Sequence, residues 1–460
     1  MAIQEEKRRL FEETPIPRAV AKLAVPTVLS SLLSLIYNLV DAYFVGLLND
    51  PVQTAAVALV APVTLAFSAV TNLFGTGGSS MMSRALGRGD LKTLRESSAF
   101  SFYGALTVGL LFSIVCTVFL TPLLSLLGAD ASTAPVTARY MRWTVCIGAA
   151  PSIVGVVMSQ MIRSEGAALH ASVGSMSGCI LNMILDPIFV LPFGLNLGAE
   201  GAALATLIAH LVSLGYLFGY LIVKRKSTYV CISPKAFTLR KEVVGGVCGV
   251  GIPACIQTSF NVIGQMITNN LTSAYGASAM AGMGIAYRIS MIPWHISHAI
   301  SMGVMPLVGY TFASRHVERM KAALKQAIKL SQCVLWTTTL FCCFFPTLVV
   351  RLFIQEPQAV AYGSSFLIAQ SLSIPLLGLD FMTIGAFQAV GRGSNALLMS
   401  TCRKVILQIP ALFILNALFP LYGLAWAQLV AEIGMGILSV FLLTRLIRQV
   451  ERTAKQEALS

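Results

Sequence analysis

Two aspartates, Asp41 and Asp186, occupy stretches of the chain that are apolar enough to cross a membrane. Asp41 directly follows the apolar run 23–40, and Asp186 closes the segment 181–186. A carboxylate at membrane depth costs several kcal/mol unless it is paired, hydrated or protonated. Carboxylates in such places mark sites that handle ions or protons, so we expect these two aspartates to bind a proton or a cation.

Each aspartate has a polar companion four residues earlier. Tyr37 precedes Asp41 and Asn182 precedes Asp186 at this spacing, which places both members of a pair on one face of a helix. Carboxylate and amide oxygens suit a hard cation such as Na⁺. Two neighbouring carboxylates are equally suited to carrying a proton. The alternative is a static hydrogen-bonded cluster that steadies the helices.

The composition indicates what kind of element must position these residues. Of 460 residues, 56% are hydrophobic and only 11% are charged, whereas soluble domains carry about 25% charged residues. The net charge of +13 is spread between apolar segments and forms no single patch, which argues against a nucleic-acid partner. The chain is therefore predicted to be an all-α polytopic membrane protein with the lipid bilayer around it.

A helix needs about 20 mainly apolar residues to cross the hydrocarbon core. Twelve segments of the chain meet this requirement. They are 23–48, 55–80, 97–127, 140–162, 169–193, 199–223, 243–275, 277–312, 327–354, 361–390, 395–419 and 421–443.

The basic residues predict how these spans are oriented. With the N-terminus placed inside, 28 of the 32 Lys and Arg residues fall on the inner side and 3 on the outer side, while Arg288 lies within a span. The inner count includes Arg403 and Lys404, which we assign with Arg392 to a cytoplasmic connection. Because positive charge concentrates on the cytoplasmic side, both termini are expected in the cytoplasm.

Orientation also predicts depth within the membrane. The first and fifth spans run outward, which places Asp41 and Asp186 toward their outer ends. The sixth span runs inward, with Thr206 one or two turns below its outer end. The sequence therefore predicts a proton- or cation-coupling site, with Na⁺ as one candidate, formed by Asp41, Asn182, Asp186 and Thr206.

The second half of the chain arranges its polar residues differently. Its first span has no acid equivalent to Asp41 and carries amides at four-residue spacing, Gln257, Asn261 and Gln265. Such a stripe forms interhelical hydrogen bonds or lines a cavity, and the sequence leaves both readings open.

One basic residue and two acids also lie within spans of this half. Arg288 and Glu432 lie at matching depths below the outer ends of their spans, so we expect Arg288 to pair with Glu432 or with Asp380. Structural pairing and direct substrate contact are the two interpretations. The residues expected to line a substrate cavity are Tyr37, Gln257, Asn261, Gln265, Arg288, Asp380 and Glu432.

The two halves repeat each other. Pro26 and Pro253 begin matching spans, and Gln160 and Gln388 mark the ends of another matching pair at nearly the same separation along the chain. Six spans per repeat predict two six-helix lobes related by a pseudo-two-fold axis along the membrane normal, with substrate bound between them. The predicted parts are 1–22 (cytoplasmic segment), 23–223 (N-lobe), 224–242 (cytoplasmic linker), 243–443 (C-lobe) and 444–460 (cytoplasmic tail).

Several motifs, in this order, resemble the multidrug and toxic compound extrusion (MATE) family, and the last two are most similar to its bacterial MepA-like branch. The resemblance covers nearly the whole chain. The motifs are 37–41 (YNLVD), 83–90 (SRALGRGD), 182–189 (NMILDPIF), 198–203 (GAEGAA), 305–310 (MPLVGY) and 387–393 (FQAVGRG).

The resemblance implies a secondary active antiporter that exports amphipathic, often cationic compounds against inward Na⁺ or H⁺. It also implies that Asp41, Asn182, Asp186 and Thr206 match the family's coupling site in the N-lobe. The amides at 257–265 depart from branches with a glutamate there, which puts a Na⁺ site in the C-lobe in doubt.

The rival function is a lipid-linked precursor or natural-product flippase of the same superfamily. Those proteins usually have fourteen spans and a more basic cavity. No nucleophile–base arrangement indicates an enzyme, and no cofactor other than the coupling ion is expected. We expect a monomer in the cytoplasmic (inner) membrane of a bacterium, with a small molecule as its partner.

Overall fold

The computed structural model describes residues 8–192 and 194–459, and in this part of the chain every regular element is helical. Eleven helices are long and apolar enough to cross a membrane. A twelfth span results when Ala134–Ile147 and Ala149–Ser164, which meet at a 44° bend, are taken together. The predicted twelve-span, all-α fold is confirmed for the described residues.

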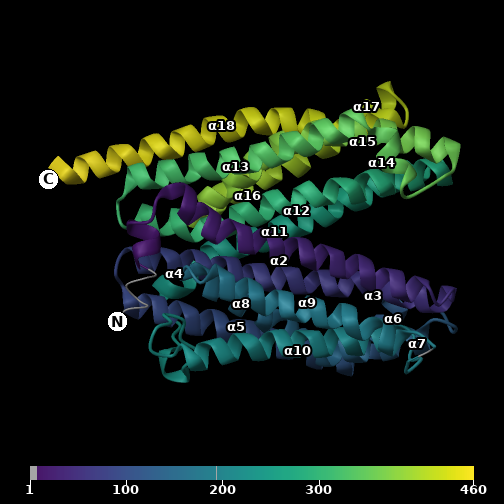
Figure 1. Cartoon of the computed structure of the whole chain (residues 1–460), viewed down its shortest axis with the longest axis horizontal. Helices are drawn as coiled ribbons and strands as arrows, with labels where there is room; N and C mark the ends of the chain where they lie inside the picture. The colour runs from purple at the N-terminus through teal and green to yellow at the C-terminus, as the bar shows by residue number, and fades with distance from the viewer. Residues whose placement is uncertain (1–7, 193, 460) are drawn as a thin grey trace. The chain divides into compact units, whose positions relative to one another are not determined.

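The elements are numbered as in Figure 1. Those of the first half are α2 (Ile16–Gly46), α3 (Pro51–Thr71), η1 (Asn72–Thr76), α4 (Gly77–Gly87), α5 (Leu91–Val118), α6 (Leu120–Leu126), α7 (Ala134–Met141), η2 (Arg142–Ile147), α8 (Ala149–Ser164), α9 (Ala168–Val190) and α10 (Ala199–Val223). Those of the second half are η3 (Pro234–Ala236), α11 (Lys241–Ser273), α12 (Ala277–Ala313), α13 (Val317–Phe344), α14 (Pro346–Arg351), α15 (Pro357–Ala389), α16 (Gly393–Thr401), η4 (Cys402–Gln408), α17 (Ile409–Leu418) and α18 (Tyr422–Leu459).

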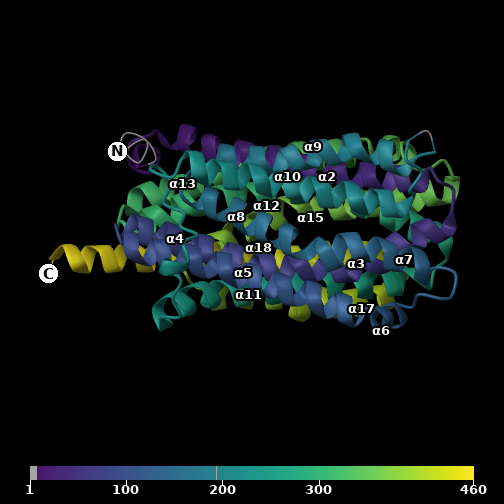
Figure 2. The same cartoon turned by 90° about the horizontal axis from the view of Figure 1, so that it is seen from below.

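The chain forms two compact units, which consist mainly of Val25–Cys255 and Ile256–Ser460. In the first unit, α9 and α10 lie side by side along their length, as both views show (Figures 1 and 2). In the second unit, α15 packs against α12, α13 and α18. The helices α2 and α11 each contribute residues to both units.

Helix lengths repeat between the halves. The spans Pro51–Gly87 and Ala277–Ala313 each have 37 residues. The helices that follow them, α5 and α13, each have 28 residues. Both pairs begin at the same separation along the chain. Equal lengths at one separation agree with the repeat that the sequence predicts.

Two predicted spans end earlier than expected. The third was predicted to reach residue 127, but α5 ends at Val118 and a separate short helix, α6, follows Phe119. The ninth was predicted over 327–354, but α13 runs from Val317 to Phe344 and α14 follows Phe345. A proline in the first turn of each short helix explains the break, because proline lacks the N–H that a continuous helix would use.

The first and last spanning helices extend toward the ends of the chain beyond the predicted spans. The helix α2 begins at Ile16, within the segment expected to precede the first span, and Pro17 lies in its first turn, where proline is tolerated. At the other end α18 continues to Leu459, through the predicted tail 444–460. Residues 1–7 of the predicted N-terminal segment lie outside the described residues.

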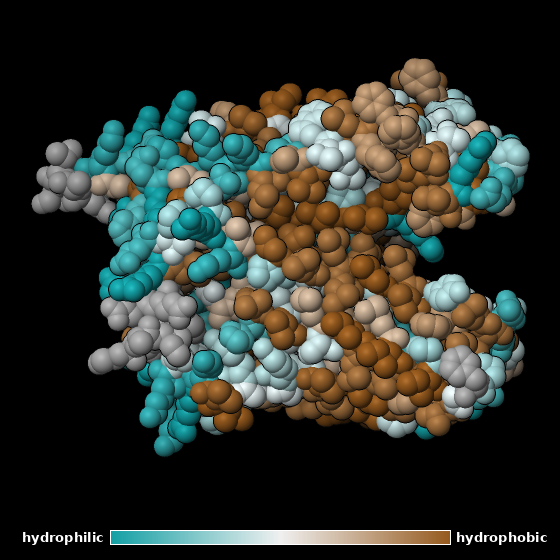
Figure 3. Space-filling view, in the orientation of Figure 1, coloured by the Kyte–Doolittle hydropathy of each residue, from teal (hydrophilic) through white to brown (hydrophobic). Residues whose placement is uncertain are grey.

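Large apolar side chains are exposed on the outer faces of the helices. On α18 they follow helical spacing, with Ile433, Ile437, Val440 and Phe441 all exposed. Figure 3 shows hydrophobic residues over the middle of the helices on the viewed face and hydrophilic residues at their ends. Exposed apolar surface of this extent needs a nonaqueous environment, and a bilayer supplies one.

The connection between α10 and α11 is held by a buried acid. Glu165, only 1% exposed, follows the last turn of α8. Its Oε1 accepts a hydrogen bond from the Tyr220 hydroxyl at 3.0 Å, and its Oε2 accepts from the Thr228 hydroxyl at 3.0 Å and from Tyr229 N at 2.6 Å. A carboxylate can accept several hydrogen bonds at once, and this one ties the connection to the first unit.

Candidate functional site

Close packing of α9 and α10 brings three of the four predicted coupling residues together. Gly178 permits this approach, because a Cβ at that position would lie 2.8 Å from the Ala209 carbonyl oxygen. Asn182 lies one turn after Gly178 on α9, and Thr206 lies one turn before Ala209 on α10. Their side chains therefore meet at the same level.

Asn182 links Asp186 to α10. Both residues are fully buried. With its amide oriented to satisfy both ends, Asn182 donates to Asp186 Oδ2 at 3.0 Å and accepts from Thr206 N at 3.1 Å and from the Thr206 hydroxyl at 3.2 Å. The predicted i, i+4 pair and Thr206 thus form one connected network.

Asp41 reaches the same region from α2. An electrostatic interaction couples it to Asp186. Asp41 Oδ1 and Asp186 Oδ1 are both buried without a hydrogen-bond partner among the described residues. Buried polar atoms are usually satisfied, so two orphaned carboxylate oxygens in one unit indicate a site that gains a partner when it functions.

A cavity opens beside these residues in the first unit. It has a volume of about 460 Å³ and is lined by Tyr37, Asp41 and Thr206 among others. A smaller cavity of about 160 Å³ adjoins Tyr37 and Asn182. Tyr37, predicted as a substrate-cavity residue, therefore lines both cavities and lies beside the coupling network.

The donor set fits a proton or a hard monovalent cation better than a transition metal. Among the described residues, no group of three His, Cys, Asp or Glu side chains could hold a metal ion. The oxygens near one another here come from two carboxylates, one amide and one hydroxyl, and such oxygen ligands suit ions of the alkali and alkaline-earth type.

In the second unit, the amide stripe on α11 serves both roles that the sequence left open. Gln257 donates to the Ser400 hydroxyl at 2.6 Å, which joins α11 to α16. Asn261 accepts from Arg403 Nη2 at 3.2 Å and also lines a cavity of about 90 Å³, as does Gln265. Gln265 itself donates to Asn269 at 2.8 Å.

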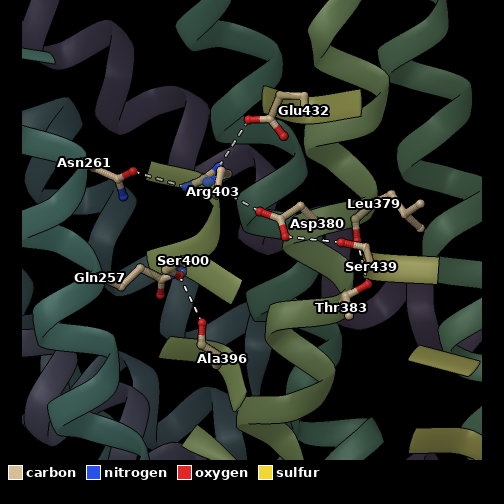
Figure 4. A network of polar contacts seen from close by, with 10 residues as sticks. All are labelled: Gln257, Asn261, Leu379, Asp380, Thr383, Ala396, Ser400, Arg403, Glu432 and Ser439. Carbon is tan, nitrogen blue, oxygen red and sulfur yellow. Dashed lines mark hydrogen bonds and ion pairs between the residues drawn. The ribbon is translucent and has the colours of Figure 1, made fainter. Parts of the chain in front are cut away.

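The predicted partner of the two C-lobe acids is wrong. Arg288 is exposed on α12, and no ion pair of the described residues involves it. Arg403 pairs with both acids, with Nε 3.5 Å from Asp380 Oδ2 and Nη1 3.8 Å from Glu432 Oε1. Figure 4 shows Arg403 between these carboxylates and Asn261.

Equal depth was an insufficient argument for pairing, because depth does not define which face of a helix a residue occupies. Glu432 and Asp380 are 2% and 0% exposed, whereas Arg288 is exposed. Of the predicted cavity residues in this unit, only Asn261 and Gln265 line the cavity described above.

The sequence analysis missed Arg403 and Lys404 as intramembrane residues. Both were assigned to a cytoplasmic connection, but they lie in η4 within the span Gly393–Leu418. Their positions inside the predicted span 395–419 were the available signal. A π-helical turn such as η4 changes the faces that later residues present and is frequent at functional sites.

Comparison with known proteins agrees with this architecture. A model of the MatE family matches residues 26–188 and 253–414. The two matched stretches are nearly equal in length and fall one in each half of the chain. The same family model therefore recognises both halves, and the predicted duplication is confirmed.

Individual relatives match along nearly the whole chain. Multidrug export protein MepA of Staphylococcus aureus (strain MRSA252) is 31% identical over 447 residues, which is 97% of each chain. The protein of the same name from Staphylococcus haemolyticus (strain JCSC1435) is 32% identical over 445 residues, 96% of each chain. A solved outward-facing multidrug resistance MATE transporter superposes with a TM-score of 0.90 at 25% identity, over 96% of this chain and 98% of that one. The chain therefore belongs to the MATE family of membrane transporters and is similar throughout to its MepA multidrug export proteins.

Proposed function

We propose that this protein is a secondary active exporter of small amphipathic, often cationic compounds, and that it exchanges them for protons or Na⁺ by alternating access between its two lobes. The relatives named above are multidrug export proteins, and their similarity over 97% of the chain supports carrying that activity to this protein. The charge distribution supports a cytoplasmic location of both termini in a bacterial inner membrane, even with Arg403 and Lys404 removed from the inner count. We propose that one chain is sufficient for transport.

A single observation carries the coupling part of the proposal. Asp41 and Asp186 each keep one buried oxygen without a hydrogen-bond partner among the described residues, close to the cavity that Asp41 lines. An intramembrane acid of this kind is the usual marker of an ion or proton pathway. Loading these oxygens would stabilise one lobe conformation, and substrate binding would stabilise the other, which gives exchange through differential affinity.

The contacts of Asn182 favour the proton. When Asp186 is ionised, the amide nitrogen donates to it and the amide oxygen accepts from Thr206. When Asp186 is protonated, the amide can turn over, so that the acid donates to the amide oxygen and the nitrogen donates to the Thr206 hydroxyl at 3.2 Å. Asp186 and the Thr206 hydroxyl thus keep a hydrogen-bond partner on Asn182 in both protonation states. A Na⁺ ion is the second candidate, since Asp41, Asp186 and Thr206 still offer oxygens to it.

The test is transport by purified protein in proteoliposomes, with tetraphenylphosphonium as the amphipathic cation. Uptake is measured under a pH gradient alone and under a Na⁺ gradient alone. We expect the pH gradient to drive uptake into vesicles with inverted orientation, and we expect Asp41→Asn and Asp186→Asn to abolish that coupling. Both substitutions keep the side-chain shape and remove the titrating group.

The matched control is Asp50→Asn. Asp50 caps α3 by accepting from Val52 N at 2.9 Å, a contact that asparagine can retain, and it lies outside the coupling network. Coupled transport should continue in this variant. Undiminished coupled transport in both Asp41→Asn and Asp186→Asn would refute the proposed mechanism, and coupling to Na⁺ alone would replace the proton with the second candidate.

A further inference from the structure

All of the charged side chains that line the polar cavity of the second unit are basic. It is lined by Arg403 and Lys404 and by amide side chains that include Asn261 and Gln265, and no Asp or Glu is among its lining residues. The two nearby carboxylates, Asp380 and Glu432, lie behind Arg403 (Figure 4). The cavity therefore presents cations and hydrogen-bond donors to whatever enters it.

Arg403 is not saturated by the acids behind it. Its Nε is 3.5 Å from Asp380 Oδ2, and neither atom has a hydrogen-bond partner among the described residues. The contact with Glu432 is longer still, at 3.8 Å. The side chain is 2% exposed and lines the cavity, and a buried guanidinium can bind an oxyanion strongly because Arg presents fixed donors that match carboxylate geometry.

Lys404 provides the second cation of the cavity wall. No hydrogen bond or ion pair joins it to the described residues of its own unit, whereas its neighbour Arg403 takes both acids. A lysine inside a membrane span is costly, and the charges of Asp380 and Glu432 act on Lys404 without contacting it. An anion in the adjacent cavity would add a counter-charge in direct contact with this lysine.

Aromatic side chains supply the apolar part of the same cavity. Tyr287 and Trp294 line it together with the basic residues. Trp294 is held in place because its ring stacks on His298, with centroids 5.2 Å apart and planes at 10°, and meets Phe381 edge to face at 5.2 Å. A fixed aromatic wall beside two cations offers contacts both to an aromatic ring and to an anionic group.

We propose that this cavity is a binding site for the carboxylate of a small aromatic compound. It would give the exporter a second recognition chemistry, complementary to the acidic network of the first unit, so that zwitterionic and anionic amphiphiles become substrates as well as cations. The part of this proposal that concerns transported compounds rests on the proposed export function. Binding itself does not depend on ion coupling, which allows the two to be tested separately.

The test compares 4-fluorobenzoate with 4-fluorobenzamide, which have nearly the same shape and differ in charge. Each is titrated at pH 7 against the full-length protein in phosphatidylcholine nanodiscs, and binding is measured from the ¹⁹F linewidth after subtraction of empty nanodiscs. A hydrogen bond to a charged group contributes roughly 1.5–3 kcal/mol, so we expect the acid to bind about tenfold tighter than the amide or better.

Lys404→Gln should reduce this preference to about twofold, whereas Lys404→Arg should keep it because the charge remains. Lys329→Gln is the matched control, since Lys329 is an exposed lysine on α13 of the same unit and does not line the cavity; the preference should be unchanged. Equal binding of acid and amide by the unmodified protein would overturn the proposal. So would an undiminished preference in Lys404→Gln.

The outcomes for the two proposals are distinguishable. If 4-fluorobenzoate is preferred but Asp41→Asn and Asp186→Asn still couple tetraphenylphosphonium uptake to the pH gradient, the coupling mechanism fails and the carboxylate site stands. If the aspartate variants uncouple transport and the acid shows no preference, the carboxylate site fails alone.

Discussion

Arg403 and Asp380 form an ion pair in which the closest atoms, Nε and Oδ2, are 3.5 Å apart although both side chains are almost completely buried. The Arg403 guanidinium also lies 5.5 Å above the Phe381 ring. Replacing both partners of a buried ion pair with apolar residues changes stability little. Removing only one partner is costly, because it leaves an uncompensated buried charge.

We predict that Arg403→Gln lowers the free energy of unfolding by roughly 3–5 kcal/mol, because it removes the cation that forms ion pairs with two buried acids. The double variant Arg403→Gln with Asp380→Asn should recover a substantial part of that loss. Thermal unfolding of the purified protein in one detergent measures both. Arg288→Gln is the control, since the exposed Arg288 should change stability by less than about 0.5 kcal/mol.

A double variant that melts no higher than Arg403→Gln would show that Asp380 is not the acid that Arg403 stabilises. In that case Glu432, whose Oε1 is 3.8 Å from Nη1, would be the energetically important partner.

The contrast between Arg288 and Arg403 shows how much of the site can be predicted from the sequence. The rarity of charges in apolar spans was enough to select Asp41, Asp186, Asp380 and Glu432 as important. Which basic residue pairs with the acids was not predictable, because pairing depends on the helix face that each residue occupies. The π-helical turn Cys402–Gln408 changes that face, and no residue pattern in the sequence predicts such a turn.

The N-lobe network was more predictable than the C-lobe network for a geometric reason. Asn182 and Asp186 belong to one regular helix at i, i+4 spacing, so their shared face followed from helix geometry. The position of Thr206 was predicted from its depth in the sixth span, and the close approach of α9 and α10 brings it to Asn182. Spans were likewise predicted where they are regular, and wrong where Phe119 and Phe345 interrupt them before a proline.

The close contact at Gly178 yields the second prediction. Gly178→Ala would place a Cβ 2.8 Å from the Ala209 carbonyl oxygen, which forces α9 and α10 apart one turn from Asn182. Overpacking of this kind costs roughly 1–3 kcal/mol, and it should also weaken the Asn182–Thr206 contact. Thermal unfolding and pH-driven transport should both decline in this variant.

Gly215→Ala is the matched control on α10. A Cβ at Gly215 meets nothing within 4 Å, so alanine should be neutral or stabilise the helix by up to about 1 kcal/mol through its higher helix propensity. Equal effects of the two substitutions would mean that helix propensity, and not the approach of α9 to α10, determines the outcome.

The third prediction concerns the connection between α10 and α11, residues 224–240. Glu165→Gln replaces a charged carboxylate with a neutral amide, which weakens the charge-assisted hydrogen bonds that Glu165 accepts from the Tyr220 hydroxyl and from Tyr229 N. The connection should detach more often, and trypsin should cut faster at its basic residues. The cleavage rate in a limited digest, followed by mass spectrometry, measures this.

Glu242→Gln provides the comparison, because Glu242 forms an exposed pair with Arg240 at 3.0 Å, and surface pairs contribute about 0–1 kcal/mol. Cleavage of this variant should match that of the unmodified protein. If Glu165→Gln is cut no faster than Glu242→Gln, the buried carboxylate does not hold the connection.

The fourth prediction is a pH dependence at the start of α5, outside the spans. Asp90 is the N-cap of this helix, and its Oδ1 accepts from Thr93 N at 3.0 Å. Hydrogen bonds from Thr93, by its hydroxyl and its backbone N–H, lower the pKa of the Asp90 carboxyl below its ordinary value. Because the folded state favours the ionised form, the charge-dependent stabilisation is present above the unfolded pKa of about 3.9 and is lost as pH falls through the lower folded value.

Asp90→Asn should retain the cap and lose only this pH-dependent part, whereas Asp90→Ala should lose the cap and cost about 1 kcal/mol at pH 7. The measurement is the difference in melting temperature between each variant and the unmodified protein from pH 7 to pH 3. For Asp90→Asn that difference should begin to shrink below about pH 4, where the unfolded state takes up the proton, and it should approach zero as the pH falls through the lower pKa of the folded state. A difference that stays constant over this range would show that the Asp90 charge adds nothing to the cap.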